Sequence, residues 1–473
     1  MIRATQSTIL TRSIPLICWI LMSCFPSMQA QESLKRVDVA TKPGAKWVAM
    51  ETRSLDQLVK QRPIAQDAGL SRYGGITARR EKATGFFHTT QVDGRWWLVD
   101  PEGCLMIHRG VTSVNRLATA AAREVFDRRY QTKERWASST TAMLREHGFN
   151  GLGAWADTDA MRAVEQPLVY TKIWNFMASY GKKRGGTYQK PGHTGYPNDC
   201  MFVFDPEFET FCDEHARQLS AQRDDPWLLG HFSDNELPLK EDALKKFLAL
   251  PEKEAGHQAA WKWLREQRGA KVAAKDVKPE DQSAFLEFMV ERYFRIVGQA
   301  IKKHDPNHLY LGSRFHGSAL RLPEIFRAAG RHVDVVSVNY YHAWTPDAKR
   351  MAMWAGEAKK PVIITEWYAK GVDSGMANTS GAGWLVKTQA DRGLFYENFT
   401  LGLLASKHCV GWHWFKYIDN DPTDRKADPS NTDSNKGMLT NRYEPYAPLL
   451  DSMKKINTRV YGIIDHFDHH ATK

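Results

Sequence analysis

The sequence predicts an α/β protein built on a (β/α)8 TIM barrel, with a short N-terminal extension and a β-hairpin ahead of the barrel. Two observations support this fold class. Short apolar stretches rich in β-branched and aromatic residues recur along the chain, and longer stretches with helical spacing lie between them. An open doubly wound sheet is the alternative. Such sheets usually carry a glycine-rich phosphate turn, and neither GxGxxG nor GxxxxGK[ST] occurs in the 473 residues.

The first thirty residues have the pattern of a secretory signal. Arg3 and Arg12 precede the apolar run IPLICWILMSCF, and small residues follow it, so we expect cleavage after Ala30. LMSC also resembles a bacterial lipoprotein signal, which makes Cys24 a candidate lipid anchor. The run is short for a bilayer, and no other long apolar stretch follows. We therefore expect an exported protein without a membrane span, either secreted, periplasmic or an outer-membrane lipoprotein.

A polar segment and a hairpin precede the barrel. We interpret residues 31–84 as an extension that packs on the larger domain, with a helix near SLDQLVKQRP. Alternating apolar and polar residues then surround Asp93 and Gly94, and Asp-Gly between such runs indicates a β-hairpin. The predicted parts are the signal (1–30), the extension (31–84), the barrel (85–465) and a solvated tail (466–473).

Eight strands and the helices between them account for the rest. We expect barrel strands at 104–111, 151–155, 168–174, 227–233, 308–314, 333–341, 361–367 and 410–417. Helical spacing is clearest at 141–148, 208–219, 282–304 and 390–406. The insertion 181–198 is rich in Gly, Lys and aromatic residues and is predicted as a long loop after the third strand. A long polar loop inside a compact domain is often functional.

The composition restricts the class of protein and its partners. With 42% hydrophobic and 25% charged residues, the chain can form a sizeable core and has no extended charge blocks. The formal charge of +11 suits an anionic partner, such as a sulfated or uronic polysaccharide, or a solvated basic surface. No nucleic-acid motif is present. Without CxxC or a His/Cys metal spacing, we interpret the four cysteines that follow the signal as structural or free, with three full pairings open: Cys104, Cys200, Cys212 and Cys409.

Polar and aromatic residues gather at the predicted carboxyl ends of the strands, where active sites of such barrels lie. Glu236 and Glu366 end the fourth and seventh strands and can face each other across the mouth. Glycosidic cleavage needs a carboxylic acid and a carboxylate on opposite sides of the bond, and burial near tryptophan would raise one pKa. The other candidates suit the hydroxyls and apolar faces of a sugar: Asn235, Trp155, Trp174, Arg314, His316, Asn339, Tyr341, Trp367 and Trp414.

Each of these signals has a structural explanation when it is taken alone. SDNEL resembles a helix N-cap, with Glu236 near the positive end of the dipole, and Glu366 could form a strand-end ion pair. No GxSxG or HExxH motif is present. Histidines near strand ends suggest a metal barrel as a minor alternative, but IHRG lacks the HxH that most such barrels carry on the first strand. We expect neither a metal nor a cofactor.

Together these residues resemble the retaining glycoside hydrolases of clan A. Asn235-Glu236 and Glu366 match the glutamates that end the clan's fourth and seventh strands. The resemblance implies that Glu236 is the acid/base and Glu366 the nucleophile. SVNYY is similar to the clan's sixth strand, which implies a hydrogen bond from Tyr341 to the nucleophile. Asn235 fits the asparagine that contacts the sugar 2-hydroxyl.

Within the clan, the chain looks like the β-agarase group, glycoside hydrolase family 50. These agarases usually carry a sizeable N-terminal β-domain, for which only a short extension is available here. Ala154 stands where a polar residue is expected before Trp, and ITEW differs from the agarase seventh strand. The segments that resemble the group are GRWWLVDPEGCLMIHRGVTSV (94–114), HGFNGLGAWAD (147–157), HFSDNEL (231–237), DPNHLYLGSRF (305–315), ITEW (364–367) and GWHWFKYID (411–419).

The resemblance implies an exported retaining hydrolase that cleaves a β-linked galactan such as agarose or porphyran by double displacement. Two alternatives stay open: a retaining β-glycosidase of another polysaccharide specificity, and a non-catalytic carbohydrate-binding barrel. A cleft that contains both glutamates would favour catalysis. The basic residues Lys182, Lys183 and Arg184 would favour an anionic glycan if they line the cleft.

Overall fold

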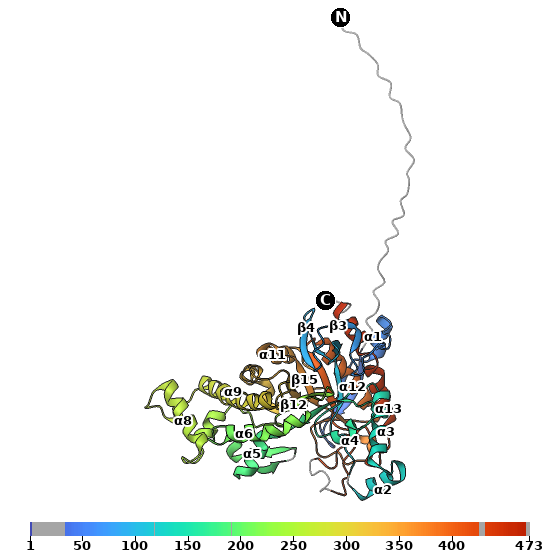
Figure 1. The fold of residues 1–473 in the computed structure, drawn as a ribbon. Helices are drawn as coiled ribbons and strands as arrows, with labels where there is room; N and C mark the ends of the chain where they lie inside the picture. Colours follow the sequence, from blue (N-terminus) through green and yellow to red (C-terminus); the bar gives the residue numbers. More distant parts are fainter. Residues whose placement is uncertain (2–33, 118, 191, 425–430, 470–473) are drawn as a thin grey trace. The chain divides into compact units, whose positions relative to one another are not determined.

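Eight parallel strands form the centre of the protein in the order that the sequence predicts (Figure 1). The computed structural model describes residues 1, 34–117, 119–190, 192–424 and 431–469, so the predicted signal and Cys24 lie outside the described residues. The barrel strands are β7 (His108–Val111), β8 (Gly151–Leu152), β9 (Val169–Ile173), β12 (Leu228–Phe232), β13 (Leu309–Tyr310), β14 (Val336–Asn339), β15 (Val362–Glu366) and β18 (Cys409–Trp414).

The barrel closes between its fifth and sixth strands. Parallel pairing follows the order β13-β12-β9-β8-β7-β18-β15-β14. The two end strands meet because Phe315 and Val338 form a parallel bridge and the Val335 amide donates to the Tyr310 carbonyl oxygen at 3.3 Å. Closure leaves these eight strands without an open edge. The predicted fold class is confirmed.

Helices surround the strands; in Figure 1, β12 and β15 lie between α9 and α11 on one side and α12 and α13 on the other. The longest, α9, begins with Pro279, has Glu280 and Asp281 in its first turn and ends with Lys302, Lys303 and His304, an order that suits the helix dipole. The described α-helices that follow β7 are α2 (Ala120–Arg129), α3 (Lys133–Glu146), α4 (Thr158–Arg162), α5 (Phe176–Arg184), α6 (Phe208–Ala216), α7 (Ala243–Leu248), α8 (Ala255–Arg268), α9 (Pro279–His304), α10 (Pro323–Gly330), α11 (Ala348–Ala358), α12 (Gln389–Ala405), α13 (Ala447–Asn457) and α14 (Val460–His469).

Two antiparallel or mixed sheets adjoin the barrel. One contains β3 (Ile76–Arg80), β4 (His88–Val92), β5 (Arg95–Val99) and β6 (Cys104–Met106). The hairpin predicted at Asp93-Gly94 joins β4 to β5, and both turn residues have positive φ. Residues 104–106 were expected in the first barrel strand but pair with β3 and β5 instead. The barrel strand therefore begins only at His108.

The second sheet joins the extension to a segment after the seventh barrel strand. It contains β1 (Lys35–Ala40), β2 (Val48–Thr52), β16 (Ala369–Gly371) and β17 (Trp384–Val386), with β1 paired antiparallel to β17. The predicted helix of the extension is α1 (Leu55–Gln61). Because β3 also pairs with β6, strands of the extension take part in both sheets. The boundary at residue 84 stays a prediction.

A pair of buried histidines lies inside the barrel. Nδ1 of His108 and Nε2 of His413 are 2.9 Å apart, and both side chains are fully buried. Glycines make room for the rings, because a Cβ added to Gly151 would lie 1.9 Å from Nε2 of His108. Burial lowers the pKa of His108 to about 3 and that of His413 well below its usual value. Both rings are therefore neutral at neutral pH.

Residues 466–469, the described part of the predicted solvated tail, are helical. Helix α14 (Val460–His469) continues past residue 466, and His466 is buried. Asp468 forms an ion pair at 2.7 Å with Arg95, whose side chain is only 1% exposed. The apolar residues of this segment recur at helical spacing and pack inward, which carries the polar residues between them into the structure.

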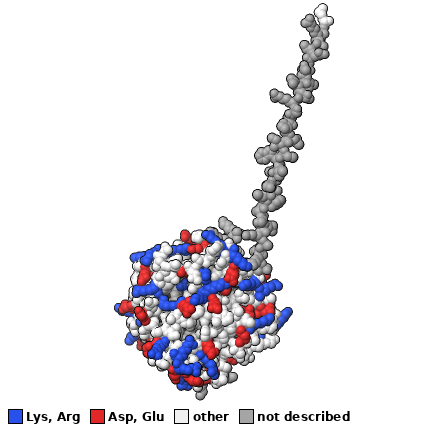
Figure 2. Space-filling view, turned by 90° about the vertical axis from the view of Figure 1, so that its right-hand side faces the viewer, with Lys and Arg blue, Asp and Glu red and all other residues white. Residues whose placement is uncertain are grey.

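The described surface and cysteines can be compared with the expectations from composition. On the face shown in Figure 2, Lys and Arg side chains are interspersed with Asp and Glu. Among the described residues, no helix has both the length and the hydropathy that crossing a bilayer requires. The four cysteines within the described part of the chain are buried free thiols.

Candidate active site

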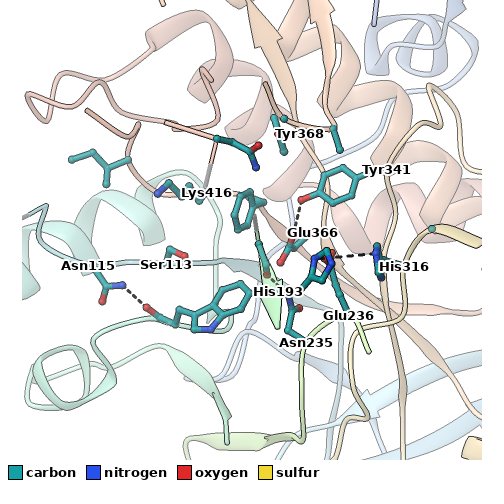
Figure 3. Close-up of a pocket in the computed structure, with 18 of the residues that line it drawn as sticks. Ser113, Asn115, His193, Asn235, Glu236, His316, Tyr341, Glu366, Tyr368 and Lys416 are labelled. Carbon is teal, nitrogen blue, oxygen red and sulfur yellow. Dashed lines mark hydrogen bonds and ion pairs between the residues drawn. The ribbon is translucent and has the colours of Figure 1, made fainter. Parts of the chain in front are cut away.

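The carboxyl ends of the barrel strands surround a cavity of about 870 Å³ (Figure 3). Glu236 and Glu366 both line it. The aromatic part of the wall consists of Trp155, Tyr341, Tyr368 and Phe415, and the Tyr341 and Tyr368 rings meet edge to face with centroids 5.6 Å apart. Aromatic rings beside paired carboxyl groups match the apolar faces and the hydroxyls of a sugar.

Glu366 ends β15 and is held by two partners. The Tyr341 hydroxyl donates to its Oε2 at 2.5 Å, and Nη2 of Arg314 lies 2.8 Å from its Oε1. The residue is only 5% exposed. Burial raises the pKa of Glu366 to about 7, although Arg314 opposes this rise, and the neighbouring Glu236 adds to it.

Glu236 lies just after β12 and has a different environment. Nδ2 of Asn339 donates to its Oε1 at 2.9 Å. Its Oε2 faces Nδ1 of His193 at 3.3 Å and Nε2 of His316 at 3.9 Å (Figure 3). Burial by itself would raise the pKa of Glu236, but His193, His316 and Asn339 outweigh it and bring this pKa below its usual value. The surroundings therefore favour the charged form of Glu236 and the protonated form of Glu366.

The helix-capping explanation of SDNEL applies to Asp234 and not to Glu236. The Asp234 carboxylate accepts hydrogen bonds from the backbone amides of Met177 and Ala178 at 2.9 and 3.1 Å, in the first turn of α5. The Tyr293 hydroxyl donates to it at 2.6 Å. Asp234 is a buried cap for a neighbouring helix, which leaves the next two residues, Asn235 and Glu236, for the cavity.

Arg314 connects Glu366 to Asn235, the residue that precedes Glu236. Its Nη1 donates to Oδ1 of Asn235 at 2.9 Å, and its guanidinium lies over the Trp155 ring at 4.2 Å from the centroid. Asn339 in turn accepts a hydrogen bond from Thr365 at 2.7 Å. A buried polar network of this kind fixes the directions of its members.

The backbone at the site is strained. Trp155, Glu236 and Arg314 have φ values of 61°, 53° and 55°, in the left-handed region that residues other than glycine rarely adopt. Such conformations persist where the surrounding structure determines them, and they cluster at functional sites.

Two groups of described side chains have the donor types and spacing of a metal site. One is His193, Glu236 and His316; the other is His231, Asp305 and His308. In the second group every ring nitrogen already has a partner. His231 accepts from Trp174 at 2.9 Å and donates to Asp305 at 2.8 Å, and His308 contacts Asp305 at 2.8 Å and the Asp225 carbonyl oxygen at 2.9 Å. No imidazole nitrogen of this group is left free for a metal, so we interpret the group as a buried hydrogen-bond network.

Comparisons with known proteins place this site in a family. The chain matches no protein-family model. A solved structure described as the crystal structure of BpGH50 is 30% identical, with a TM-score of 0.79, over 94% of this chain and 98% of that one. The chain belongs to glycoside hydrolase family 50. Its resemblance to that family is thereby confirmed.

Other relatives of this family 50 chain carry agarase names. Beta-agarase B of Vibrio sp. (strain JT0107) is 28% identical, over 87% of this chain and 52% of the relative. The crystal structure of an agarase, AgWH50C, is 25% identical with a TM-score of 0.69, over 86% of this chain and 68% of that one. The chain spans about half the length or less of the curated relatives it matches.

Most of the predicted site residues of this family 50 chain come together. Trp155, Asn235, His316 and Tyr341 line the cavity with the two glutamates. Arg314 and Asn339 lie behind that wall and hold the glutamates in place.

Three predicted tryptophans do not line the cavity. Trp367 and Trp414 are fully buried, and Trp367 stacks on Phe399 at 4.5 Å, toward α12. Trp174 donates to His231 in the buried network described above. The reason is the two-residue period of a strand: Glu366 and His413 face inward, so the residues next to them face outward.

His193 is the main site residue that the sequence did not single out. It belongs to a hairpin of β10 (Tyr188–Lys190) and β11 (His193–Gly195) inside the insertion 181–198. That insertion was predicted as a loop, but its first residues continue α5 to Arg184 and the hairpin follows. Nδ2 of Asn235 donates to the Gly192 carbonyl oxygen at 3.1 Å, which docks the hairpin on the cavity. The sequence signal that indicated a functional role for this segment was its composition, which is rich in Gly, Lys and aromatic residues.

Proposed function

We propose that the chain is an exported retaining glycoside hydrolase that cleaves a β-linked galactan of the agarose or porphyran type. The observation that carries this proposal is a single aromatic cavity lined by two buried glutamates with different partners. The agarase names of the relatives support the choice of substrate. Because both glutamates line one cavity, catalysis is favoured over the alternative of a non-catalytic carbohydrate-binding barrel.

In the proposed mechanism, Glu366 is the nucleophile. Arg314 and Tyr341 hold its carboxylate in one orientation, so that an oxygen can attack the anomeric carbon. Glu236 donates a proton to the glycosidic oxygen as that bond breaks, and the aglycone sugar leaves as an alcohol. Glu236 then takes a proton from water, whose oxygen attacks the anomeric carbon and releases Glu366. Asn235 is the proposed contact of the sugar 2-hydroxyl.

The proton must reside on Glu236 when the bond breaks, whereas the surrounding residues favour a protonated Glu366. The active species is then a singly protonated pair in its less populated arrangement. Positive charge that develops on the sugar favours the Glu366 carboxylate, and Arg314 already lies beside it. The reaction itself therefore favours the arrangement in which the proton is on Glu236 and Glu366 is a carboxylate.

The basic residues that would favour an anionic glycan are only partly placed to act. Lys182 lines a second hollow of about 430 Å³, which shares Trp155, His193 and Asn235 with the main cavity. Arg184 is engaged in ion pairs with Asp205 and Glu254. Lys182 thus gives specific support to a sulfated galactan over a neutral one.

The test is product release from agarose, porphyran, carrageenan and non-algal β-glycans, with wild type, Glu366→Gln and Glu324→Gln. Glu324 is buried and lies outside the cavity, so it is a matched control. We expect release from one red-algal galactan, lost in Glu366→Gln, kept in Glu324→Gln, and with the β-anomer formed first by NMR. Release from another glycan would reject the substrate. Binding without release in wild type would reject the activity, and the α-anomer formed first would reject retention.

A further inference from the structure

We propose that His193, Glu236 and His316 form a binding site for a transition-metal ion such as Zn²⁺, and that a bound ion reversibly blocks the cavity. The site adds to the proposed hydrolase a means of inhibition by metal. It requires no cofactor role for the ion.

The donor atoms have nearly the spacing that a small ion needs. One oxygen of Glu236 lies 3.3 Å from a His193 nitrogen and 3.9 Å from a His316 nitrogen, and the three donors lie within 4.8 Å of one another. Ligands at about 2.0–2.2 Å from a tetrahedral Zn²⁺ are separated by about 3.4 Å. Small rotations of the two imidazoles therefore bring all three into contact with one ion.

The environment leaves these donors available. Asn339 occupies Oε1 of Glu236, so that Oε2 is left to face both histidines. Nδ1 of His316 and Nδ1 of His193, which is the nitrogen that faces Glu236, are both buried without a hydrogen-bond partner among the described residues. The network of His231, Asp305 and His308 lacks this property, because its ring nitrogens are already engaged.

Two histidines and one carboxylate are a ligand set that Zn²⁺ uses in proteins, with the fourth position open. Here that position faces the cavity, where water or a sugar hydroxyl can occupy it. A metal bound to Glu236 holds it as a carboxylate, which cannot protonate a leaving oxygen. This consequence rests on the proposed function, whereas the binding site does not. Protons compete for the histidines, so affinity falls as the solution becomes more acidic.

The first experiment is calorimetric titration of the full chain with Zn²⁺ at neutral pH. We expect one site per chain, with affinity reduced at least tenfold in His316→Gln and in His193→Gln. His342→Gln is the matched control, because His342 lines the same cavity outside the triad. Melting curves without metal show whether each variant is folded, and the two variants provide independent tests.

Two results would overturn the site. Equal stoichiometry and affinity in wild type and the folded triad variants would exclude it. Loss of binding only when the C-terminal histidines 469 and 470 are replaced by glutamine would show an adventitious ion only.

A second readout addresses inhibition. If wild type cleaves a glycan, Zn²⁺ should suppress the release of product, and EDTA should restore it. Any residual activity of His193→Gln should be insensitive to the same concentration of Zn²⁺. Full inhibition of that variant at the same Zn²⁺ concentration would reject blockage through this site. If no glycan is cleaved, the calorimetry still decides the metal site, so failure of the proposed function is distinguishable from failure of this proposal.

Discussion

The neutral histidine pair inside the barrel makes the fold sensitive to acid. The pKa of His108 is about 3 in the folded protein and about 6.5 when the ring is exposed. Below pH 6.5 the unfolded chain binds a proton that the folded chain rejects, so stability falls with decreasing pH until about pH 3. Two pH units at 1.36 kcal/mol per unit give a loss of about 2.7 kcal/mol at pH 4.5 from this residue alone.

The perturbation that isolates this contribution is His108→Gln. Glutamine does not titrate, and its amide can still hydrogen-bond to Nε2 of His413. Urea unfolding followed by tryptophan fluorescence gives the free energy of unfolding at pH 7 and pH 4.5 for both proteins. Groups that do not contact His108 titrate alike in the two proteins and cancel in the comparison, and the pKa of His413 stays lowered in both, chiefly by burial. We expect wild type to lose about 2–3 kcal/mol more than the variant. Equal losses would refute the assignment of acid sensitivity to His108.

Three further predictions concern the site and its support. Tyr341→Phe removes the hydrogen bond from the Tyr341 hydroxyl to the Glu366 carboxylate, and a bond of this kind contributes about 1.5–3 kcal/mol. We therefore expect kcat/KM to fall roughly 10- to 150-fold with little change in melting temperature. An unchanged kcat/KM would exclude a role of Tyr341 in positioning Glu366. The pH profile of kcat/KM should be bell-shaped, because only the singly protonated pair of glutamates is active. The alkaline limb should lie near the Glu366 pKa of about 7, and the acid limb should lie below the usual glutamate value because the pKa of Glu236 is lowered. Constant activity from pH 6 to 9 would contradict this assignment. Asp305→Asn weakens the buried contacts that the carboxylate makes with His231 and His308, each at 2.8 Å, and should cost about 1–3 kcal/mol in urea unfolding at pH 7; wild-type stability would show that the network is dispensable.

The barrel strands could be predicted because each is buried on both sides and therefore is a nearly continuous apolar run. The glutamates could be predicted because barrel geometry brings strand ends to one face. The outward orientation of the Trp367 side chain also follows from the sequence, because neighbouring residues of a strand point to opposite faces and Glu366 points inward.

Other features depend on contacts that no local pattern contains. The position of His193 follows from docking of its hairpin on Asn235, which lies more than forty positions further along the chain. Strand β1 is only half buried and pairs with a strand near residue 386, so the sequence around it indicated no more than an extension. The pKa of Glu236 is lowered and that of Glu366 is raised because His193 and His316 face Glu236.

The sheet that joins β1 to β17 has a consequence for synthesis of the chain. Val39 pairs with Val386, and the segment between Glu366 and β17 includes Tyr368 and Gly381 of the cavity wall. A ribosome adds roughly 5–20 residues per second, so β1 waits on the order of tens of seconds for its partner strand. During that time one edge of the β1–β2 hairpin is open to pairing with other chains. The cavity wall is therefore among the last parts of the protein to form.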